Sequence, residues 1–442
     1  MRNAGLSRFM ADERGGGTIM GLFWFMVLLA AAGLAVDSTD GLRNKTMLQA
    51  TADAAALAAA IDLPNETQVV DTAVTYATSN MVTGHYGSVL NPGDVTIGTW
   101  DHATRTFIAN AALPDAVHVL VRRATANDNA VPVNFLRIIG FDSWDVQAQS
   151  IAQRFIPPCL RDGLISRQIV DISSNNDFVK EICVHGEQGV DMQNGNYFEL
   201  GTTVSMPDLD MLVIPNNGMT SNPGLPDALR ENYLDPRMVN HIDEIMLAML
   251  GQSQVMAQAA VLPNYINPDL PVLEVDASFN LSNAEEGRIY HVGCEPSQQV
   301  KFSAKSTLTN VVIIADCIIH LPADISLADV VLGSRSGGNG DVNNENITMA
   351  ANVNLGAPDG CAEGGGVTLL SNASIKTAAS TSINGVQMVA KGYIELTARN
   401  KGINGISAQA GGDITMTANN IMGLCSGGAP NLFTVPYYRL VL

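Results

Sequence analysis

The chain has 442 residues, with 24 Lys and Arg against 43 Asp and Glu, and a formal net charge of −19. This acidic balance excludes nucleic acid and anionic lipid as partners of the folded part, because phosphate binding needs a basic surface. The apolar fraction of 46% is enough for packed cores, and the length suggests about three domains.

The N-terminal region predicts a membrane anchor. Residues 1–16 form a short polar arm, expected to be cytoplasmic, and an uncharged apolar run follows from Gly17 through Trp24 to Val36. At about 1.5 Å per residue, a helix of this length crosses a hydrocarbon core of roughly 30 Å. A cleaved signal peptide and a buried core helix are the alternatives. The anchor is favoured because a helix-forming, alanine-rich segment follows, so a mature N-terminus would otherwise begin inside a helix.

The basic residues give a nearly even balance across this span, with Arg2, Arg8 and Arg14 before it and Arg43 and Lys45 after it. The orientation therefore rests on the long C-terminal part and its cysteines. We expect a single-pass protein whose C-terminal part lies in the periplasm or on the cell-surface side.

Three short motifs surround the span. They are Glu13-Arg14-Gly15, the sequence Gly33-Leu34-Ala35-Val36-Asp37, and Leu48-Gln49-Ala50-Thr51-Ala52-Asp53-Ala54-Ala55-Ala56-Leu57-Ala58. Together they resemble the N-terminal segment of TadG-like proteins of the bacterial Flp (tight-adherence) pilus-assembly systems. The resemblance covers the chain from its start to about Ala60, and its motif residues are Asp37, Gln49 and Asp53.

This resemblance implies a non-catalytic structural protein of the bacterial inner membrane. The implied partners are the lipid bilayer and other pilus-assembly proteins or pilin-like helices, which could pack on the alanine-rich face of the helical stalk (residues 17–61). In the segment Gly17 to Ala60, no glutamate stands five residues after a Gly, as it does in cleaved prepilins, so processing by a prepilin peptidase is not expected.

Residues 62–156 predict a small α+β module. Apolar residues recur at helical spacing over 68–77, and alternating patterns predict strands at 95–100, 107–109, 117–122 and 145–152. Residues Pro132–Ile139 predict a further helix, closed by Gly140. His102 and His118 are expected to be surface or strand residues rather than metal ligands.

Pro157-Pro158 marks a boundary, after which Asn, Gly, Ser and β-branched residues increase. Residues 157–442 predict a solenoid, interrupted at about 205–287 by a loop and a helix near Asp227–Leu250. One face of that helix carries four apolar residues, for which buried packing is the favoured interpretation and a partner groove the alternative. These residues are Ile242, Ile245, Met246 and Met249.

The C-terminal third contains an internal repeat. One series of strand starts stands at Ile347, Val367, Val386 and Ile406, and a second series stands at Leu355, Ile375, Ile394 and Ile414. Both series recur at a period of roughly 20 residues, and two interleaved series indicate two strands per repeat in a stacked solenoid. Leucine-rich and left-handed hexapeptide patterns are absent. The predicted fold is therefore α+β/all-β: a transmembrane helix continuing as a stalk, a small α+β module, and a right-handed parallel β-helix-like solenoid.

Six cysteines all follow the span, without Cys-x-x-Cys spacing or a clustered His, so disulfides in an oxidising compartment are favoured over buried thiols. In each of the pairs Cys159 with Cys183 and Cys294 with Cys317, the two cysteines stand close to one repeat apart. Residues one coil apart stack at about 4.8 Å, within reach of a disulfide. We therefore predict Cys159–Cys183 and Cys294–Cys317 and, by elimination, Cys361–Cys425.

No catalytic motif is present, and no cofactor, metal or small-molecule substrate is expected. The sequence Ile169-Val170-Asp171-Ile172-Ser173-Ser174-Asn175 resembles the metal-ion adhesion loop of von Willebrand A-type domains, but Asn175 replaces the second loop serine. A turn at a strand end is favoured there over a metal site. The segment 337–341 resembles half of a calcium β-roll motif, but a loop is favoured. His241 and Glu244 share a helix face that is expected to be solvated.

Two functions remain: a membrane-anchored structural protein, and a β-helix lyase or hydrolase tethered to the envelope and acting on polysaccharide. The enzyme would need clustered carboxylates with Arg or Lys on one face. The spacing of the charged residues after Ile347 does not predict two carboxylates in consecutive coils on one face, so the structural protein is favoured. These charged residues are Asp359, Glu363, Lys376, Lys391, Glu395, Arg399, Lys401 and Asp413.

Overall fold

The computed structural model describes residues 16–161, 163–337, 344–360, 362, 364–397, 402–425 and 433–442. The chain forms two compact units, one of Met1–Phe155 with Pro436–Leu442 and one of Ile156–Val435. The predicted polar arm lies outside the described residues except for Gly16, and so do Glu363, Arg399 and Lys401. Residues 436–442, which the sequence assigned to the solenoid, belong instead to the first unit.

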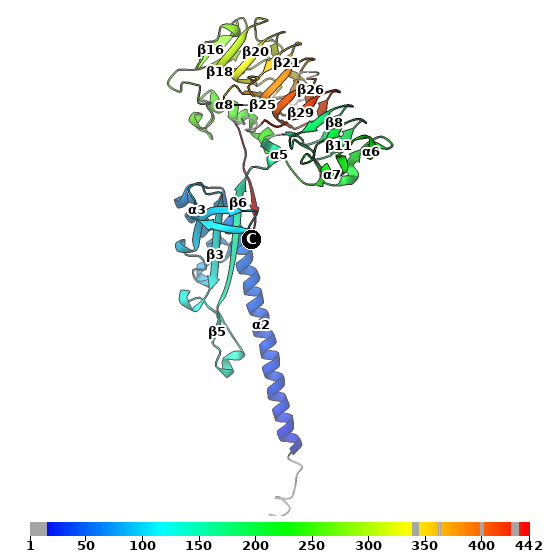
Figure 1. Cartoon of the computed structure of the whole chain (residues 1–442). Coiled ribbons are helices and arrows are strands. Elements are labelled where there is room, and N and C mark those ends of the chain that lie inside the picture. The colour runs from blue at the N-terminus through cyan, green and yellow to red at the C-terminus, as the bar shows by residue number, and fades with distance from the viewer. Residues whose placement is uncertain are drawn as a thin grey trace, which may run out of the picture. The chain divides into compact units, whose positions relative to one another are not determined.

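The first unit is built around one continuous helix, α2 (Gly16–Ala60), which Figure 1 shows in dark blue. Most apolar side chains of its first half are exposed: Ile19 is 73% exposed and Leu28 is 64% exposed. Among the described residues, α2 is the one helix long and apolar enough to cross a membrane, and 6% of its most apolar window is buried. The predicted run therefore forms a long apolar helix that the protein itself does not cover.

The second half of α2 packs on a five-stranded antiparallel sheet of order β2-β1-β3-β6-β30, together with α3 (Glu66–Asn80). Ala52, Ala55 and Ala59 are fully buried in this layer. The strands are β1 (Val95–Asp101), β2 (Thr106–Ala109), β3 (Ala116–Arg123), β6 (Val146–Phe155) and β30 (Tyr437–Leu440). Short helices follow α3, namely α4 (Thr83–Tyr86), η2 (Pro92–Asp94) and η3 (Thr125–Asn127).

The predicted helix Pro132–Ile139 is wrong. The segment forms β4 (Val131–Pro132) and, after a short connection, η4 (Leu136–Ile139), while β5 (Ser143–Trp144) pairs with β4. Pro132 does not begin a helix, because its backbone belongs to β4, which pairs with β5 in a hairpin. The predicted Gly140 does end η4, with a φ of 94° in the left-handed region that glycine tolerates.

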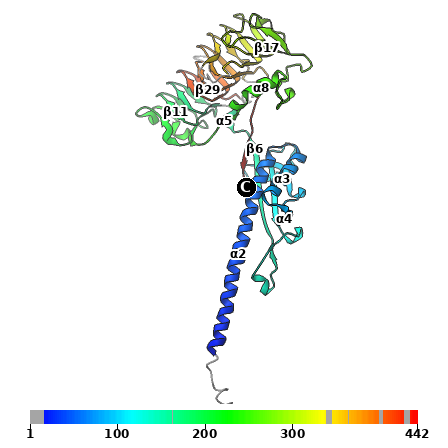
Figure 2. The same ribbon diagram turned by 180° about the vertical axis from the view of Figure 1, so that it is seen from behind.

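The second unit is a strand-rich body dominated by two parallel sheets (Figures 1 and 2). The larger sheet follows the order β15-β13-β10-β7-β27-β25-β22-β20-β18-β17-β16, and the smaller follows β14-β11-β8-β28-β26-β24-β21-β19. The apolar core consists largely of side chains from these two sheets, such as Leu332, Ile375 and Ile394.

Many strands of the larger sheet are short, as expected for β-branched segments separated by Gly and Asn turns, whereas β18, β20 and β25 have nine residues each. They are β7 (Gly163–Ser166), β9 (Asp177–Val179), β10 (Cys183–Gly186), β12 (Tyr197–Phe198), β13 (Thr203–Met206), β15 (Leu229–Glu231), β16 (Leu273–Asp276), β17 (Arg288–Gly293), β18 (Thr307–Ala315), β20 (Ser326–Ser334), β22 (Asn354–Leu355), β23 (Val367–Ser371), β25 (Ser382–Ala390), β27 (Ile403–Ala410) and β29 (Ile421–Gly423).

The smaller sheet comprises β8 (Ile169–Ile172), β11 (Gly189–Met192), β14 (Leu212–Val213), β19 (Ile319–Leu321), β21 (Glu345–Met349), β24 (Ser374–Lys376), β26 (Ile394–Leu396) and β28 (Ile414–Met416). Short helices of this unit are α5 (Pro158–Arg161), η5 (Leu209–Met211), α6 (Gly218–Ser221), α7 (Leu225–Ala228), η7 (Gln258–Ala260) and η8 (Leu281–Asn283).

The observed strand pairing agrees with the later residues of each predicted series. Ile375, Ile394 and Ile414 are aligned on neighbouring strands of the smaller sheet. The first member of each predicted series is wrong, since Ile347 pairs with Ile375 rather than with Val367, and Leu355 pairs with Ile383. The step from Ile347 to Ile375 is longer than the later steps to Ile394 and Ile414, so a constant period misassigned these strands.

The spatial order of the strands differs from their order in the chain. β15 and β16 are consecutive in sequence but stand at opposite ends of the larger sheet, and β7 pairs with β27 from the far end of the unit's sequence. The first repeats therefore stack beside the last ones. The segment 232–272, within the predicted insertion, carries the chain from one end of the sheet to the other.

Within that segment, α8 (Ile242–Met249) follows η6 (Arg237–His241). The predicted helix near Asp227–Leu250 is thus shorter than expected, because Pro236 cannot continue a helix and precedes η6. The four predicted apolar residues of its face are buried and cluster with Ile314, Val331 and Leu370 of the larger sheet. The favoured interpretation, buried packing, is therefore confirmed at this helix.

Candidate functional site

The first candidate site is the attachment of Asp37 to the loop before η4. Asp37 is 3% exposed, and its carboxylate accepts three backbone N–H groups, from Asn134 at 2.9 Å, Phe135 at 3.0 Å and Leu136 at 2.7 Å. Three donors replace the water that the carboxylate loses on burial. The family-motif acid after the span therefore fixes a loop almost a hundred positions later in the chain to the helix.

Two glycines on the same face of α2 allow this close approach. A Cβ at Gly33 would lie 2.5 Å from the Cβ of Phe135, and a Cβ at Gly41 would lie 2.6 Å from Cε3 of Trp144. Gly33, Asp37 and Gly41 are four residues apart, so they form one stripe along the helix. The hairpin of β4 and β5 thus lies against α2, as Figures 1 and 2 both show.

The other motif residues connect α2 to the sheet. The Gln49 side chain donates from Nε2 to Asp53 Oδ1 at 2.9 Å and to the Gln149 carbonyl of β6 at 3.1 Å. One turn earlier, Lys45 donates to the Gln147 carbonyl at 2.6 Å. Gln49 therefore acts inside the unit by holding the helix in register with β6, and Asp53 accepts a hydrogen bond from Gln49.

The alanine-rich face of α2 is not available to pilin-like helices, contrary to the expectation from the resemblance. Ala52, Ala55, Ala56 and Ala59 are fully buried, and they contact the unit's own strands and α3. Small side chains let helix and sheet approach closely, which is the same property that suggested an intermolecular contact. The sequence alone could not show whether the alanine face packs on the chain's own strands and α3 or on another protein.

The cysteine geometry fits the repeat. The predicted pairs Cys159–Cys183 and Cys294–Cys317 lie at disulfide distance, with Cα–Cα separations of 5.1 and 5.7 Å. Cys361 lies outside the described residues, so the third predicted pair is not described. Cys425 is among the cysteines with a bonded partner.

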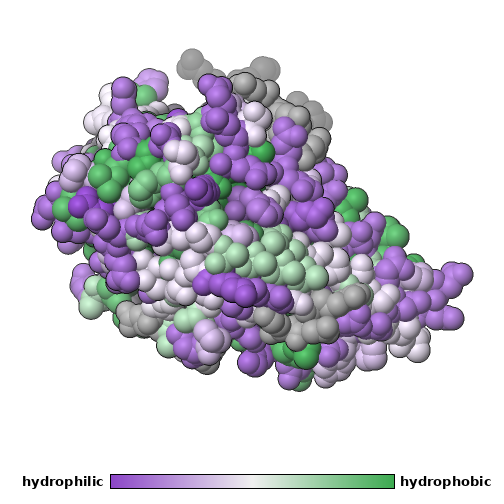
Figure 3. All heavy atoms as spheres, turned by 90° about the horizontal axis from the view of Figure 1, so that it is seen from above, coloured by the Kyte–Doolittle hydropathy of each residue, from purple (hydrophilic) through white to green (hydrophobic). Residues whose placement is uncertain are grey.

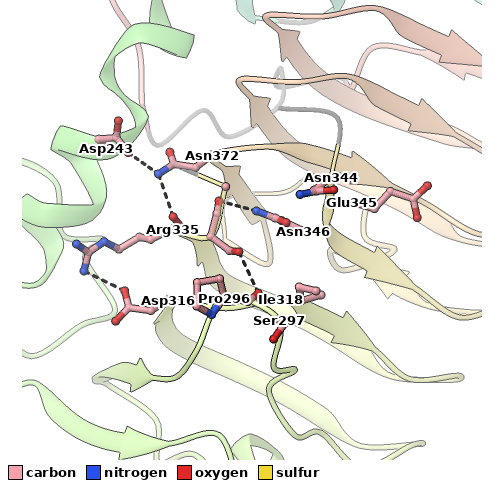
Figure 4. A pocket seen from close by; sticks show the side chains of 12 residues that line it. Asp243, Pro296, Ser297, Asp316, Ile318, Arg335, Asn344, Glu345, Asn346 and Asn372 are labelled. Carbon is pink, nitrogen blue, oxygen red and sulfur yellow. Dashed lines mark hydrogen bonds and ion pairs between the residues drawn. The ribbon is translucent and has the colours of Figure 1, made fainter. Parts of the chain in front are cut away.

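A polar cavity of about 720 Å³ opens beside the second unit's strands (Figure 4). Figure 4 shows Arg335 directed at Asp316, with Nη1 and Oδ1 at 3.1 Å, and Asn372 donating to Asp243 of α8. Asp243 also pairs with Lys391. The acidic groups at this wall of the cavity are thus already bonded to cations or amides of the chain.

Next to this cavity, a histidine joins two acids. His291 lies 2.6 Å from Glu274 through Nδ1 and 3.1 Å from Asp316 through Nε2, and Asp316 also binds Arg335. Sequence reasoning missed this group. The only signal in the sequence is that Glu274, His291 and Asp316 stand about one repeat apart, a spacing that places residues on neighbouring strands.

A third group places a lysine between two acids on neighbouring strands; Glu345 precedes the charged residues considered after Ile347, and the two acids are two strands apart rather than on consecutive ones. Lys376 Nζ lies 3.0 Å from Glu345 Oε1 and 3.2 Å from Glu395 Oε2, from three neighbouring strands. The Lys376 hydrogen bond holds the pKa of Glu345 below its usual range. Burial and the Glu345 bond raise the pKa of Tyr393 to about 12. Glu345, Lys376 and Glu395 line a cavity of about 490 Å³ together with His320 and Thr397.

The remaining predicted candidates are not brought into one site. Asp171 lies in β8 beside Asp191 of β11, and partial desolvation together with the charges of Asp191 and Asp413 raises its pKa. In the part of the chain that the structure describes, no three His, Cys, Asp or Glu residues form a group suited to a metal ion. The β-roll-like segment lies outside the described residues except for Gly337.

The histidines singled out in the sequence serve local contacts. His118 lies in β3, 3.3 Å from Gln149 Oε1, and His102 lies 3.0 Å from Arg439 Nη2 of the C-terminal strand. His241 is exposed at the end of η6, and the carboxylate of Glu244 accepts from Ser253.

The surface face drawn in Figure 3 is mainly hydrophilic, with its hydrophobic residues in small separated groups.

Comparison with known families matches both units. Residues 34–152 match the family described as Tad-like Flp pilus-assembly, which agrees with the resemblance of the N-terminal motifs and supports a Tad-like pilus-assembly protein. Residues 163–426, more than half of the chain, match a domain of unknown function (DUF7867). No curated protein matches the chain.

Proposed function

Because the chain belongs to the DUF7867 family and carries a Tad-like Flp pilus-assembly region, we propose that it is a membrane-anchored structural component of pilus assembly or surface adhesion. The observation that carries this proposal is that two boundaries fall at nearly the same position of α2: the start of the Tad-like match and the end of the exposed apolar half. The Tad-like match begins at residue 34, where the exposed apolar half of α2 gives way to the half packed on the sheet. A folded Tad-like unit is thereby joined, without a linker, to a helix whose apolar surface needs another cover.

The proposed cover is the lipid of the bacterial inner membrane. Residues 17–36 would span its hydrocarbon core as a single pass, and the second unit would project into the periplasm or toward the cell surface. The two cysteine pairs at disulfide distance support an oxidising compartment for that unit. The partners would be the bilayer and other pilus-assembly proteins.

The second unit is proposed to be a right-handed β-helix-like solenoid that works as a spacer or presentation surface. Its support is the long parallel stack with aligned apolar residues such as Val190, Ile394 and Ile414. Such a stack buries a continuous core and leaves long lateral faces. An acidic, hydrophilic lateral face would remain soluble while contacting other components.

The role is proposed to be non-catalytic. Lys376 stands between Glu345 and Glu395, and its hydrogen bond lowers the Glu345 pKa, so this carboxyl is poorly suited to donate a proton at neutral pH. A second candidate, a tethered polysaccharide lyase or hydrolase, is favoured only by the presence of this same acid–lysine–acid row. Incubating the full-length protein with acidic polysaccharides tests it: turnover that is lost in Glu395→Gln would support the enzyme.

Gene deletion tests the structural role. We expect loss of pili, or pili that no longer adhere, with rescue by the wild-type gene. The two outcomes separate assembly from adhesion, whereas normal pili with normal adherence would contradict both.

Membrane fractionation tests the anchor separately. Full-length protein should remain in the carbonate-washed membrane pellet. A variant with Leu28→Arg in the apolar half should be released or degraded, because a charge at the bilayer centre is costly. The matched Leu113→Arg variant, at a site 86% exposed in the first unit, should behave as wild type. Release of the wild-type protein would overturn the anchor.

A further inference from the structure

We propose that the loop carrying η4 is a second membrane contact, which inserts its exposed apolar side chains into the lipid interface beside the transmembrane helix. We call Phe135, Ile138 and Phe141 the apolar tip; they are 46%, 85% and 59% exposed. The inference rests on the proposed span and adds a lipid-binding site on a different part of the chain. It commits to lipid as the occupant.

The apolar tip is held at a defined depth along α2. The three N–H bonds to Asp37 come from residues 134–136, at the start of the tip. Gly33 removes the side chain that would otherwise collide with Phe135. The tip is therefore fixed beside the turn of α2 that contains Gly33 and Asp37.

That turn is where the apolar run of the helix ends. Leu34 and Val36 are still about half exposed, and Asp37, Ser38 and Asp40 follow. With a rise of about 1.5 Å per residue, the stretch from Gly33 to Asp37 covers roughly 6 Å along the axis. If residues 17–36 lie in hydrocarbon, the apolar tip lies at the level of the lipid headgroups and the first acyl carbons.

The composition of the loop suits this depth. Aromatic rings favour the interface, and a short apolar segment can lie about 5–10 Å into the boundary between headgroups and chains. Arg137 lies between Phe135 and Ile138, and Asp142 follows Phe141; both are largely exposed, lie 3.4 Å from each other and can remain in the headgroup layer. Trp144 packs on Gly41, about two turns beyond Gly33 and away from the hydrocarbon.

The hydrogen bonds of Asp37 explain why its carboxylate is tolerated at the edge of the hydrocarbon. An acid at the edge of hydrocarbon is costly unless its oxygens are bonded. Three backbone donors satisfy it, and it is almost fully covered by the loop. The same contact thus removes a charge from the lipid boundary and places three apolar side chains there. Continuity with the exposed apolar half of α2 favours lipid over a protein partner, because lipid already has to surround that half.

Depth-dependent fluorescence quenching tests the proposal. The full-length protein is reconstituted into phosphatidylcholine vesicles after Ile138→Cys substitution and labelling with an environment-sensitive fluorophore under non-reducing conditions. Unsubstituted protein measures background labelling. Leu28→Cys reports on the span, and Leu113→Cys, at an 86% exposed site of the same unit, is the solvent control. Quenchers are carried on lipids either near the glycerol backbone or near the chain end.

We expect the label at position 138 to be quenched about twofold or more above the label at 113, and more strongly by the shallow quencher than by the deep one. The label at 28 should respond to the deep quencher. Quenching at 28 with none at 138 would overturn the tip and leave the anchor intact. Absence of quenching at both positions would overturn both the tip and the proposed span.

Discussion

Asn420 and Asn176 are joined by two hydrogen bonds although they stand near opposite ends of the second unit's sequence. The backbone N–H and the side-chain amide of Asn420 both donate to Oδ1 of Asn176, at 2.9 and 3.2 Å. The same pattern continues from the Asn176 N–H to Asn196 Oδ1 and from the Asn196 N–H to Asn222 Oδ1. All four side chains are buried. This asparagine ladder crosses the junction at which the first repeats meet the last.

The ladder predicts a stability cost at the junction. Asn176→Ala removes the acceptor of the buried Asn420 N–H and the donor to the Ser173 carbonyl. Because a buried group left without its partner costs about 1–3 kcal/mol, the free energy of unfolding should fall by roughly that amount. Urea unfolding of the full-length protein in detergent measures the change. The exposed Asn232→Ala is the matched control and should unfold as wild type; equal midpoints for both variants would contradict the ladder's role.

The Asp37 attachment predicts a local loss of protection. Asp37→Ala leaves three backbone N–H groups, at residues 134–136, without their acceptor. Hydrogen bonds to a charged group contribute about 1.5–3 kcal/mol, so hydrogen exchange of these amides should accelerate by roughly tenfold or more. Exchange measured by mass spectrometry on the peptide covering the loop checks this. Asp71→Ala, at an exposed position of α3, serves as control, and unchanged exchange in the Asp37 variant would refute the attachment.

The neighbouring acids of the smaller sheet predict a pH-dependent effect. Asp171 is exposed, but partial desolvation and the charges of Asp191 and Asp413 raise its pKa, so the folded state binds its proton more tightly than the unfolded state does. The ionised group therefore opposes folding at neutral pH, and this penalty disappears as pH falls through the raised pKa toward the ordinary range of Asp. Asp171→Asn should stabilise the protein at about pH 7.5, by less than about 1 kcal/mol because solvent screens exposed charges.

Thermal unfolding at two pH values tests this sign. The gain in Tm from Asp171→Asn should shrink when the pH is lowered to about 4.5, since the wild-type carboxyl is then increasingly protonated. Asp210→Asn, an exposed acid of η5, is the control for a generic charge change. A gain that grows toward low pH would show that the shift has the opposite direction.

The two cysteine pairs predict disulfide-dependent stability. Cys294 and Cys317 close a loop of about one repeat, and a bond across such a loop stabilises a protein by about 2–4 kcal/mol. Peptide mapping without reductant should find the linked pair, and the double Cys294→Ser and Cys317→Ala variant should unfold at lower denaturant concentration. Unmodified wild-type protein treated with reductant should shift in the same direction. Free thiols at both positions would disprove the pairing.

Several features could be predicted from local patterns. The apolar run before Asp37 and the alanine-rich segment behind it predicted one long helix, because helix propensity and uncharged length are properties of neighbouring residues. The alignment of Ile375, Ile394 and Ile414 followed from an even spacing. The one-repeat separation of Cys294 and Cys317 placed them correctly at disulfide distance.

Other features depended on which distant segments meet. Nothing near Gly163 indicates that its strand pairs with residues around Ser407, because short apolar strands of similar composition can pair with many others. The constant period failed at Ile347, where one longer repeat shifts the register. The row of Glu345, Lys376 and Glu395 was missed, because Glu345 precedes the charged residues considered after Ile347 and reaches Lys376 across this longer step.

The sequence by itself therefore determined that the protein has an exposed apolar helix, a Tad-like segment and a repetitive β-rich body. The tertiary structure decided what these parts contact. It buried the alanine face of α2 against its own sheet, bonded Asp37 to the loop of η4, and closed the first repeats onto the last through Asn176 and Asn420. Periodicity fixes which side of a segment is apolar, whereas the partner for that side is selected by long-range packing and hydrogen bonding.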